Sequence, residues 1–245
     1  MARDTLAAQR CEDVRNVEIV GVIPAAGHAL RLQPLVGSKE MLEIGRRPVL
    51  DYLVERMRVG GCTRLRIVTR PEKEDLIAHA EEIGAEIVLG HPGTVSESFL
   101  AGVAALAADD IALIGFPDTI WEPVDGYRPV VAAVHEGADV GLGLFRIAAS
   151  DLTRSDVVIF GQTGRITGID VKPAEPASEW IWGCAAARVD TWAGLHRAEW
   201  PGSYMDLLCR EGRDVRGFEL SDIWLDIGTQ EALRHIRERS SEISP

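Results

Sequence analysis

The sequence predicts an α/β protein with a Rossmann-like central sheet that is mixed but mostly parallel and is flanked by helices. Short apolar segments alternate with amphipathic ones through the first half of the chain, a pattern that favours right-handed βαβ units. Segment 111–116 is continuously apolar, as expected of a strand covered on both faces. A strand at 19–23 runs into a loop of small residues, Pro24 to Gly27, where a phosphate can approach the backbone.

Composition and length limit the possible classes of protein. The 245 residues are enough for one α/β domain with a full core, and residues 1–16 are expected to form a frayed leader. The net charge of −12 argues against nucleic acid or an anionic membrane as partner. No uncharged apolar run is long enough to span a bilayer. The four cysteines lack metal-ligand spacing, which predicts reduced thiols in a cytoplasmic protein.

The elements can be assigned in order from periodicity and breakers. A helix runs from Pro48 to Gly60, where two glycines end it. The first half then continues with a strand at 65–69, a helix at 71–83, a strand at 85–89 and a helix at 95–106. The second half has strands at 140–147, 157–160, 165–171 and 180–187, with a hairpin connection at 161–164. Helices at 190–198 and 203–211, strands at 215–220 and 222–226, and a helix at 229–239 complete the chain.

Segment 22–50 carries a spaced set of residues that matches a known signature. The matching positions are Gly27, Arg31, Leu32, Pro34, Leu35, Lys39, Glu40, Met41, Leu42 and Pro48. With these residues the chain resembles the sugar-1-phosphate nucleotidylyltransferases, and most of all the uridylyl- and thymidylyltransferases that act on glucose 1-phosphate. An ordinary strand-loop-helix turn explains fewer of these positions, and the dinucleotide-binding pattern of three spaced glycines is absent.

Three positions depart from that signature. Ala29 stands where a second glycine is usual, Leu30 where Thr or Ser is usual, and Ser38 where Pro is usual. If position 29 needs a positive φ, alanine costs on the order of 1 kcal/mol. Restoring Gly and Thr at positions 29 and 30 is expected to tighten triphosphate binding roughly ten-fold.

The resemblance implies roles for the residues of the loop and of the segment after it. Ala25, Ala26 and Gly27 would bind the triphosphate through backbone N–H groups. Arg31 and Lys39 would be the catalytic cations, one on the departing pyrophosphate and one on the α-phosphate. Residues 17–120 would then form mainly the nucleotide-binding half of a single domain, and residues 121–245 mainly the sugar-phosphate-binding half.

Two carboxylates lie at positions that suit a metal ion. Asp118 directly follows the apolar strand at 111–116, and Asp226 lies in a segment, 224–229, that resembles the second metal-binding motif of the family. Either aspartate alone could simply start a turn or cap a helix. Together they predict a Mg²⁺ site, because Mg²⁺ prefers one or two carboxylates plus substrate phosphates and water.

The acceptor and the base have weaker signatures. Lys172 lies in a Lys-Pro pair that in the family binds the sugar phosphate, and Gly183 aligns with a glycine beside the sugar. Val171 replaces the Glu that usually contacts sugar hydroxyls, and Asp170 faces the other side of the strand. Glu97 occupies the position of a base-reading Gln, with a solvated residue of the first helical turn as the equally weighted alternative.

These observations predict an enzyme that transfers a nucleotidyl group from a nucleoside triphosphate, UTP or dTTP first, to a sugar 1-phosphate such as glucose 1-phosphate. Pyrophosphate is released, Mg²⁺ is the cofactor, and a homo-oligomer is possible. Two alternatives stay open. The first is a degenerate member that binds a sugar nucleotide without turnover, and the second is a transferase for another phosphorylated alcohol such as phosphocholine.

Overall fold

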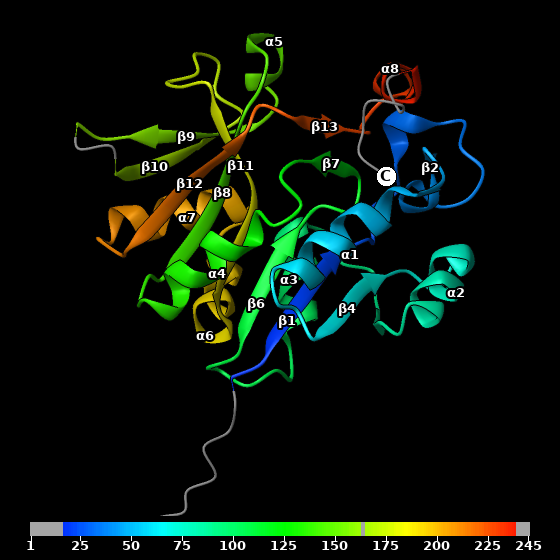
Figure 1. The fold of residues 1–245 in the computed structure, drawn as a ribbon, viewed down its shortest axis with the longest axis horizontal. Helices are drawn as coiled ribbons and strands as arrows, with labels where there is room; N and C mark the ends of the chain where they lie inside the picture. The colour runs from blue at the N-terminus through cyan, green and yellow to red at the C-terminus, as the bar shows by residue number, and fades with distance from the viewer. Residues whose placement is uncertain (1–16, 163–164, 239–245) are drawn as a thin grey trace, which may run out of the picture.

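The computed structural model describes residues 17–162 and 165–238. The expected leader, 1–16, the middle of the hairpin connection, 163–164, and position 239 lie outside the described residues. The remainder is organised around a nine-stranded sheet with the strand order β10-β9-β11-β6-β1-β4-β5 (Figure 1). Strand β8 also pairs with β11, and β12 pairs with β8. The nine strands are β1 (Ile19–Pro24), β4 (Arg64–Thr69), β5 (Glu86–Leu89), β6 (Ile111–Gly115), β8 (Val140–Arg146), β9 (Asp156–Phe160), β10 (Ile166–Val171), β11 (Trp180–Arg188) and β12 (Val215–Ser221).

The sheet confirms the predicted fold class. Strands β6, β1, β4 and β5 are parallel, and β11 joins β6 in the antiparallel sense, so the sheet is mixed where the second half of the chain enters it. In a parallel sheet the ligand site is expected outside the carboxyl ends of the strands. Here that edge carries the loop after β1 and the segment after β6.

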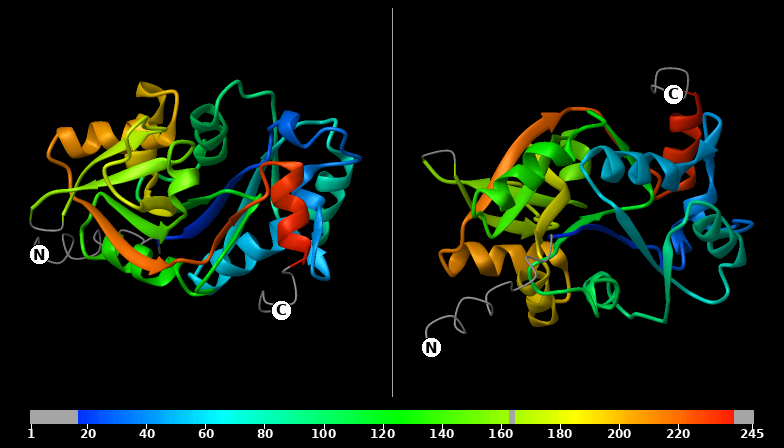
Figure 2. Two further views of the ribbon diagram at one scale, coloured as in Figure 1. Left: turned by 90° about the horizontal axis from the view of Figure 1, so that it is seen from above. Right: turned by 60° about the horizontal axis from the view of Figure 1, so that its bottom comes forward.

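Helices cover both faces of this sheet (Figure 2). One face packs against α1 (Val49–Val59), α2 (Glu74–Glu82) and α4 (Tyr127–His135), and the other against α3 (Val95–Val103), α6 (Val189–Trp192) and α7 (Pro201–Arg210). Close packing of α3 depends on Gly102, because a Cβ there would lie 2.2 Å from a methyl carbon of Val22 on β1. The remaining helical segments are α5 (Ala149–Leu152), α8 (Gln230–Glu238), η1 (Leu30–Leu32), η2 (Lys39–Met41) and η3 (Ala193–Arg197).

Helix α4 is the main element that the sequence analysis does not predict. Its segment contains Pro129, but the proline lies in the first helical turn, where a missing N–H costs little. Tyr127 begins the helix and is fully buried, with its hydroxyl donating to the Ile114 carbonyl oxygen at 2.9 Å. Tertiary packing therefore determines this helix more than its local pattern does.

Two small sheets stand beside the large one. Strands β2 (Glu43–Ile44) and β3 (Arg47–Pro48) form a short ribbon before α1. Strand β7 (Thr119–Trp121), directly after Asp118, pairs antiparallel with β13 (Trp224–Asp226), so that Thr119 lies opposite Asp226. This second ribbon brings the two predicted metal ligands together from distant parts of the chain.

Candidate active site

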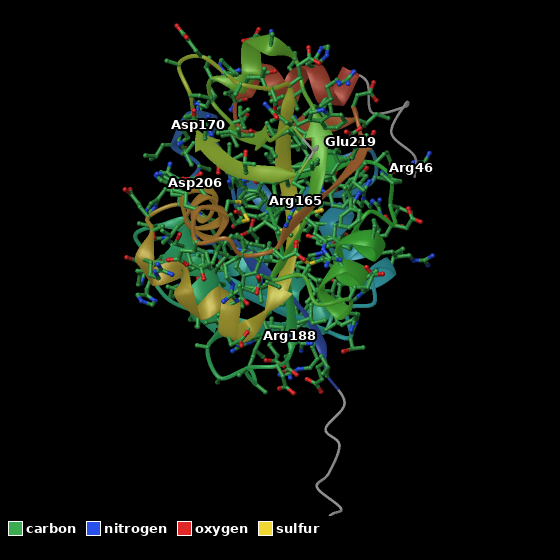
Figure 3. All side chains as sticks on the ribbon, turned by 90° about the vertical axis from the view of Figure 1, so that its left-hand side faces the viewer. Arg46, Arg165, Asp170, Arg188, Asp206 and Glu219 are labelled. Carbon is green, nitrogen blue, oxygen red and sulfur yellow. The ribbon has the colours of Figure 1, made fainter. Side chains whose placement is uncertain are left out.

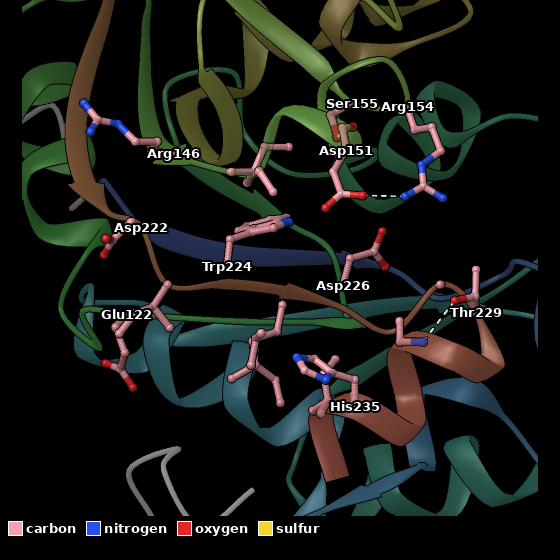
Figure 4. Close-up of a pocket in the computed structure, with 18 of the residues that line it drawn as sticks. Glu122, Arg146, Asp151, Arg154, Ser155, Asp222, Trp224, Asp226, Thr229 and His235 are labelled. Carbon is pink, nitrogen blue, oxygen red and sulfur yellow. Dashed lines mark hydrogen bonds and ion pairs between the residues drawn. The ribbon is translucent and has the colours of Figure 1, made fainter. Parts of the chain in front are cut away.

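Two cavities open at the carboxyl edge of the sheet, and both contain Arg31 and Gly228 in their walls. The first, which we call the loop cavity, has a volume of about 560 Å³ and is lined by the loop after β1, Lys39, the start of α3 and Asp118. The second, which we call the β13 cavity, has a volume of about 700 Å³ and lies between β13, α5 and α8 (Figure 4). A ligand that fills both cavities therefore passes Arg31 and Gly228.

The loop after β1 is held by hydrogen bonds on one side and faces the loop cavity on the other. Ala26 and Gly27 line the loop cavity. Ala25 is buried and does not line it, and its N–H donates to the Val68 carbonyl oxygen at 2.8 Å. Arg70 holds the loop by donating from Nε to the Ala26 carbonyl oxygen at 2.5 Å. Of the three predicted backbone groups, those of Ala26 and Gly27 are the ones that face the cavity.

The rest of the loop contains a residue with a left-handed backbone. Ala29 has φ 52° and ψ 37°, which is the left-handed region that usually belongs to glycine. Leu30 is 78% exposed, so its side chain contributes little packing. Position 29 therefore has the positive φ that the sequence analysis made the condition for strain at this alanine.

Lys39 and Asp118 form the centre of the site. Lys39 Nζ lies 2.5 Å from Asp118 Oδ2, and the two side chains are 20% and 17% exposed. Burial lowers the pKa of Lys39, but Asp118, Glu40 and Asp226 together raise it further, so the net pKa is above its ordinary value. Lys39, at the start of η2, is therefore protonated and positively charged, as stabilisation of phosphate charge requires.

Asp226 completes an acidic pair with Asp118. The two segments are joined by a hydrogen bond from the Ile227 N–H to the Asp118 carbonyl oxygen at 2.9 Å. The pKa of Asp226 is raised to about 6, first because the surrounding protein displaces water from the carboxylate and second because of the negative charge of Asp118. Solvent still reaches this residue. Two neighbouring carboxylates, one of which has a raised pKa, are a fitting donor set for a divalent cation, which relieves their repulsion.

Gly228 lets Arg31 approach this pair. A Cβ at position 228 would lie 3.1 Å from both Arg31 Nη2 and Asp226 Oδ1, so a larger residue would push on both side chains. Gln230 fixes the same region by donating to the Leu32 carbonyl oxygen, which ties α8 to η1. Arg31, Lys39, Asp118 and Asp226 are thus brought together as the sequence predicts.

The predicted base-reading residue lies at the mouth of the loop cavity without lining it. Glu97 accepts a hydrogen bond from the Gly93 N–H at 2.6 Å, while the Thr94 hydroxyl accepts from the Glu97 N–H at 3.1 Å, so both side chains cap α3. Gly93, Thr94 and Ser98 do line the cavity. Ser98 is buried, and its hydroxyl has no hydrogen-bond partner within the described protein, a feature that no sequence motif indicates.

Lys172 lies beside the loop cavity and lines neither cavity. It has φ 51°, and its Nζ lies 4.0 Å from the centre of the Trp200 ring, which does line the loop cavity. Asp156 accepts a hydrogen bond from Trp182 Nε1 at 3.2 Å. Burial raises the pKa of Asp156, and this hydrogen bond and the charge of Lys172 oppose the rise. Asp170 is exposed on the outer edge of β10, as expected for the residue beside Val171 (Figure 3).

Gly183 has a packing role that its alignment does not indicate. A Cβ at this position would lie 2.1 Å from the Trp224 ring, so the glycine allows the indole to sit against β11. The indole is part of the wall of the β13 cavity, opposite the paired side chains of Arg154 and Asp151 on α5 and the turn after it (Figure 4). Arg154 is close enough to lower the pKa of Asp226. The sequence analysis misses Arg154 because it belongs to no motif.

The chain is similar to several known nucleotidyltransferases. The model of the MobA-like NTP transferase domain matches residues 21–144. A glucose-1-phosphate thymidylyltransferase of Actinoplanes sp. is 28% identical over 167 residues, which is 64% of this chain and 54% of that protein. The UTP–glucose-1-phosphate uridylyltransferase AglF of Haloferax volcanii is 26% identical over 235 residues, 90% of this chain and 96% of that protein. The chain spans about half the length of the first curated relatives that it matches.

Solved structures share the fold at low identity. A UDP-glucose pyrophosphorylase from Acinetobacter baumanii superposes with a TM-score of 0.75 at 14% identity, covering 90% of this chain and 92% of that one. An apo UDP-glucose pyrophosphorylase gives a TM-score of 0.78 at 14% identity, covering 92% and 98%. Among the described helices, none has the length and apolar character that crossing a membrane requires. The resemblance to sugar-1-phosphate nucleotidylyltransferases is confirmed, and the chain belongs to the family of MobA-like NTP transferase domains.

Proposed function

We propose that this protein transfers a nucleotidyl group from a nucleoside triphosphate to a sugar 1-phosphate and releases pyrophosphate. The observation that carries the proposal is the convergence of Lys39, Asp118, Asp226 and Arg31 where two cavities meet. The substrates that we expect first are UTP or dTTP and glucose 1-phosphate, and the expected compartment is the cytoplasm.

The arrangement supports an in-line displacement. An oxygen of the acceptor phosphate forms a bond to the α-phosphorus of the nucleotide, and the bond from that phosphorus to the bridging oxygen of pyrophosphate breaks. The nucleotide would occupy the loop cavity, with its phosphates at Ala26 and Gly27. The acceptor would approach from the side of Lys172 or of the β13 cavity. No covalent enzyme intermediate is required, so positioning and charge stabilisation supply the catalysis.

Each site residue has a separate electrostatic task. Lys39 would stabilise the charge that develops on the α-phosphate, and Arg31 would bind the departing pyrophosphate. Asp118 and Asp226 would hold Mg²⁺, which neutralises phosphate charge when bound. In this reaction Lys39 would exchange part of its contact with Asp118 for the substrate, which its position at the cavity wall permits.

The test is pyrophosphate release, scanned over the four common nucleoside triphosphates in the presence of Mg²⁺ and several acceptors. The acceptors are glucose 1-phosphate, other hexose 1-phosphates and phosphocholine. Asp118→Asn and Asp226→Asn should each lower turnover by orders of magnitude, while Asp170→Asn, on the outer edge of β10, serves as the matched control. Absence of pyrophosphate with every pair, from a folded protein that binds a nucleotide sugar, would favour the degenerate member instead.

A further inference from the structure

The three lysines of the chain are distributed in an informative way. Lysine and arginine together number 26, and only Lys39, Lys73 and Lys172 are lysines. Two of them are the predicted phosphate-binding cations, and the third, Lys73, is adjacent to the same segment. Lys73 Nζ donates to Glu40 Oε1 at 2.9 Å, to Glu40 Oε2 at 2.8 Å and to the Ala25 carbonyl oxygen at 2.7 Å. All three ammonium donors are therefore used inside the protein.

Glu40 is the partner that makes this contact strong. Its side chain is fully buried, and burial raises its pKa, which the positive charges of Lys73 and Lys39 oppose. A buried carboxylate of this kind needs a cation at hydrogen-bond distance. Lys73 is also the residue that precedes α2, so the pair fixes Glu40 and Ala25 to the start of that helix.

A second contact fixes the other neighbour of Lys39 to the same helical turn. Asp75, in the first turn of α2, accepts hydrogen bonds from the Ser38 N–H at 2.8 Å and from Ser38 Oγ at 2.6 Å. Gly37, at φ 79°, passes so near that a Cβ there would lie 2.7 Å from Asp75 Oδ2. Ser38 is buried and Asp75 is exposed, so both donors lie on the protein side of this contact.

We infer that Lys73 and Asp75, which we call the α2 clamp, are positioning residues for Lys39. The clamp holds residues 38 and 40 by hydrogen bonds. The side chain of Lys39, which lies between them in the sequence, extends to Asp118. Neither clamp residue lines the loop cavity or the β13 cavity. The clamp therefore acts through Lys39 and not through substrate contact, and this inference rests on the proposed function of Lys39.

The clamp also accounts for the departure at position 38. A proline at this position would fix φ covalently but would offer Asp75 neither an N–H nor a hydroxyl. Ser38 has φ −83° and supplies both donors, so two hydrogen bonds replace the restriction of the ring. Asp75 and Ser38 then form one functional unit, and the loss of Asp75 should matter only while residue 38 is serine.

The test is a rescue experiment on the full chain. Asp75→Ala should lower kcat roughly ten-fold and leave the nucleotide KM within about two-fold, because the transfer step and not ground-state binding loses the positioned ammonium. Ser38→Pro combined with Asp75→Ala should regain kcat to within about three-fold of wild type. Glu74→Ala, an exposed charge in the same turn, is the matched control and should be neutral. Lys73 is a poor target, since removing it leaves Glu40 buried and unpaired.

A second measurement does not need turnover. Pyridoxal 5′-phosphate with borohydride labels lysine amines, and peptide mass spectrometry resolves the three lysines. Lys39 should be labelled several-fold faster in Asp75→Ala than in wild type, and the added Ser38→Pro should reverse that gain. If the wild type releases no pyrophosphate, the proposed function fails and the labelling rates alone judge the clamp. Labelling or kcat in Asp75→Ala equal to that of Glu74→Ala, or no rescue by proline, would overturn the inference.

Discussion

Replacing Ala29 with glycine should stabilise the protein with little effect on nucleotide binding. An L-residue in the left-handed region costs roughly 1–2 kcal/mol, and Ala29 has φ 52°. Glycine removes that cost but loses more backbone entropy on folding, by roughly 0.5–1 kcal/mol. The difference predicts that Ala29→Gly raises the free energy of unfolding by about 0.75 kcal/mol, and by at most about 1.5 kcal/mol.

The structure divides the earlier expectation of ten-fold tighter binding into two parts. The free protein already holds the left-handed backbone at position 29, so the strain opposes folding and is the same before and after a nucleotide binds. Ala29→Gly alone should therefore change the Mg²⁺-nucleotide affinity by less than about two-fold. Leu30→Thr adds a hydroxyl at an exposed position on the cavity wall, and one hydrogen bond of about 1 kcal/mol gives roughly five-fold tighter binding.

Urea unfolding and calorimetric titration measure the two parts separately. Gly27→Ala is the control for stability, because a Cβ at position 27 meets no atom within 4 Å and should cost little. The reasoning would be refuted if Ala29→Gly bound nucleotide ten-fold more tightly without Leu30→Thr. The strain would then be released on binding, which requires the loop to leave its present backbone.

Four further predictions concern other parts of the molecule. The pKa of Asp226, raised from 3.8 to about 6, means that the metal-free folded state holds a proton more tightly than the unfolded chain. Its stabilising effect is complete below 3.8 and is lost as pH rises through about 6, so the unfolding free energy of wild type relative to that of Asp226→Asn should fall over this window. Lys172→Ala should raise the KM for the acceptor more than the KM for the nucleotide in initial-rate assays, and equal changes would argue against its acceptor role. Ser98→Ala should leave the urea midpoint unchanged and weaken nucleotide binding several-fold by calorimetry, because its buried hydroxyl has no partner within the described protein; unchanged affinity would assign the hydroxyl no ligand. Arg56→Met should lower the unfolding free energy by about 3 kcal/mol, since Arg56 is 2% exposed and bonds the Trp121 and Tyr52 carbonyl oxygens, and a loss below 1 kcal/mol would show that water replaces those bonds.

Local pattern is sufficient where a residue's role depends on its own segment. The apolar run before Asp118, the turn after Asp226 and the loop after β1, read together with the family resemblance, predict four residues that the fold brings to one place: Arg31, Lys39, Asp118 and Asp226. The left-handed backbone at position 29 also agrees with the pattern.

Pattern fails where the role depends on contacts between distant segments. No motif in the sequence gives Lys73 a role, and only the fold reveals Glu40 and Ala25 beside its ammonium. Glu97 shows the second of its two predicted outcomes: it is an exposed residue of the first turn of α3, and its oxygen accepts from the Gly93 N–H. That bond is local, but the same sequence also permits the base-facing rotamer, so a spacing rule cannot choose between them.

The pairing of β7 with β13 has a consequence for how this site can change. Asp118 and Asp226 depend on the register of a two-stranded ribbon that is separate from the nine-stranded sheet. A slip of one residue would turn Asp226 to the opposite face of the ribbon while leaving the large core intact. Insertions or deletions in 222–228 should thus yield proteins that fold but lack activity, whereas those inside β1 or β6 should yield unfolded proteins. Loss of activity and loss of structure are therefore separable by position along this chain.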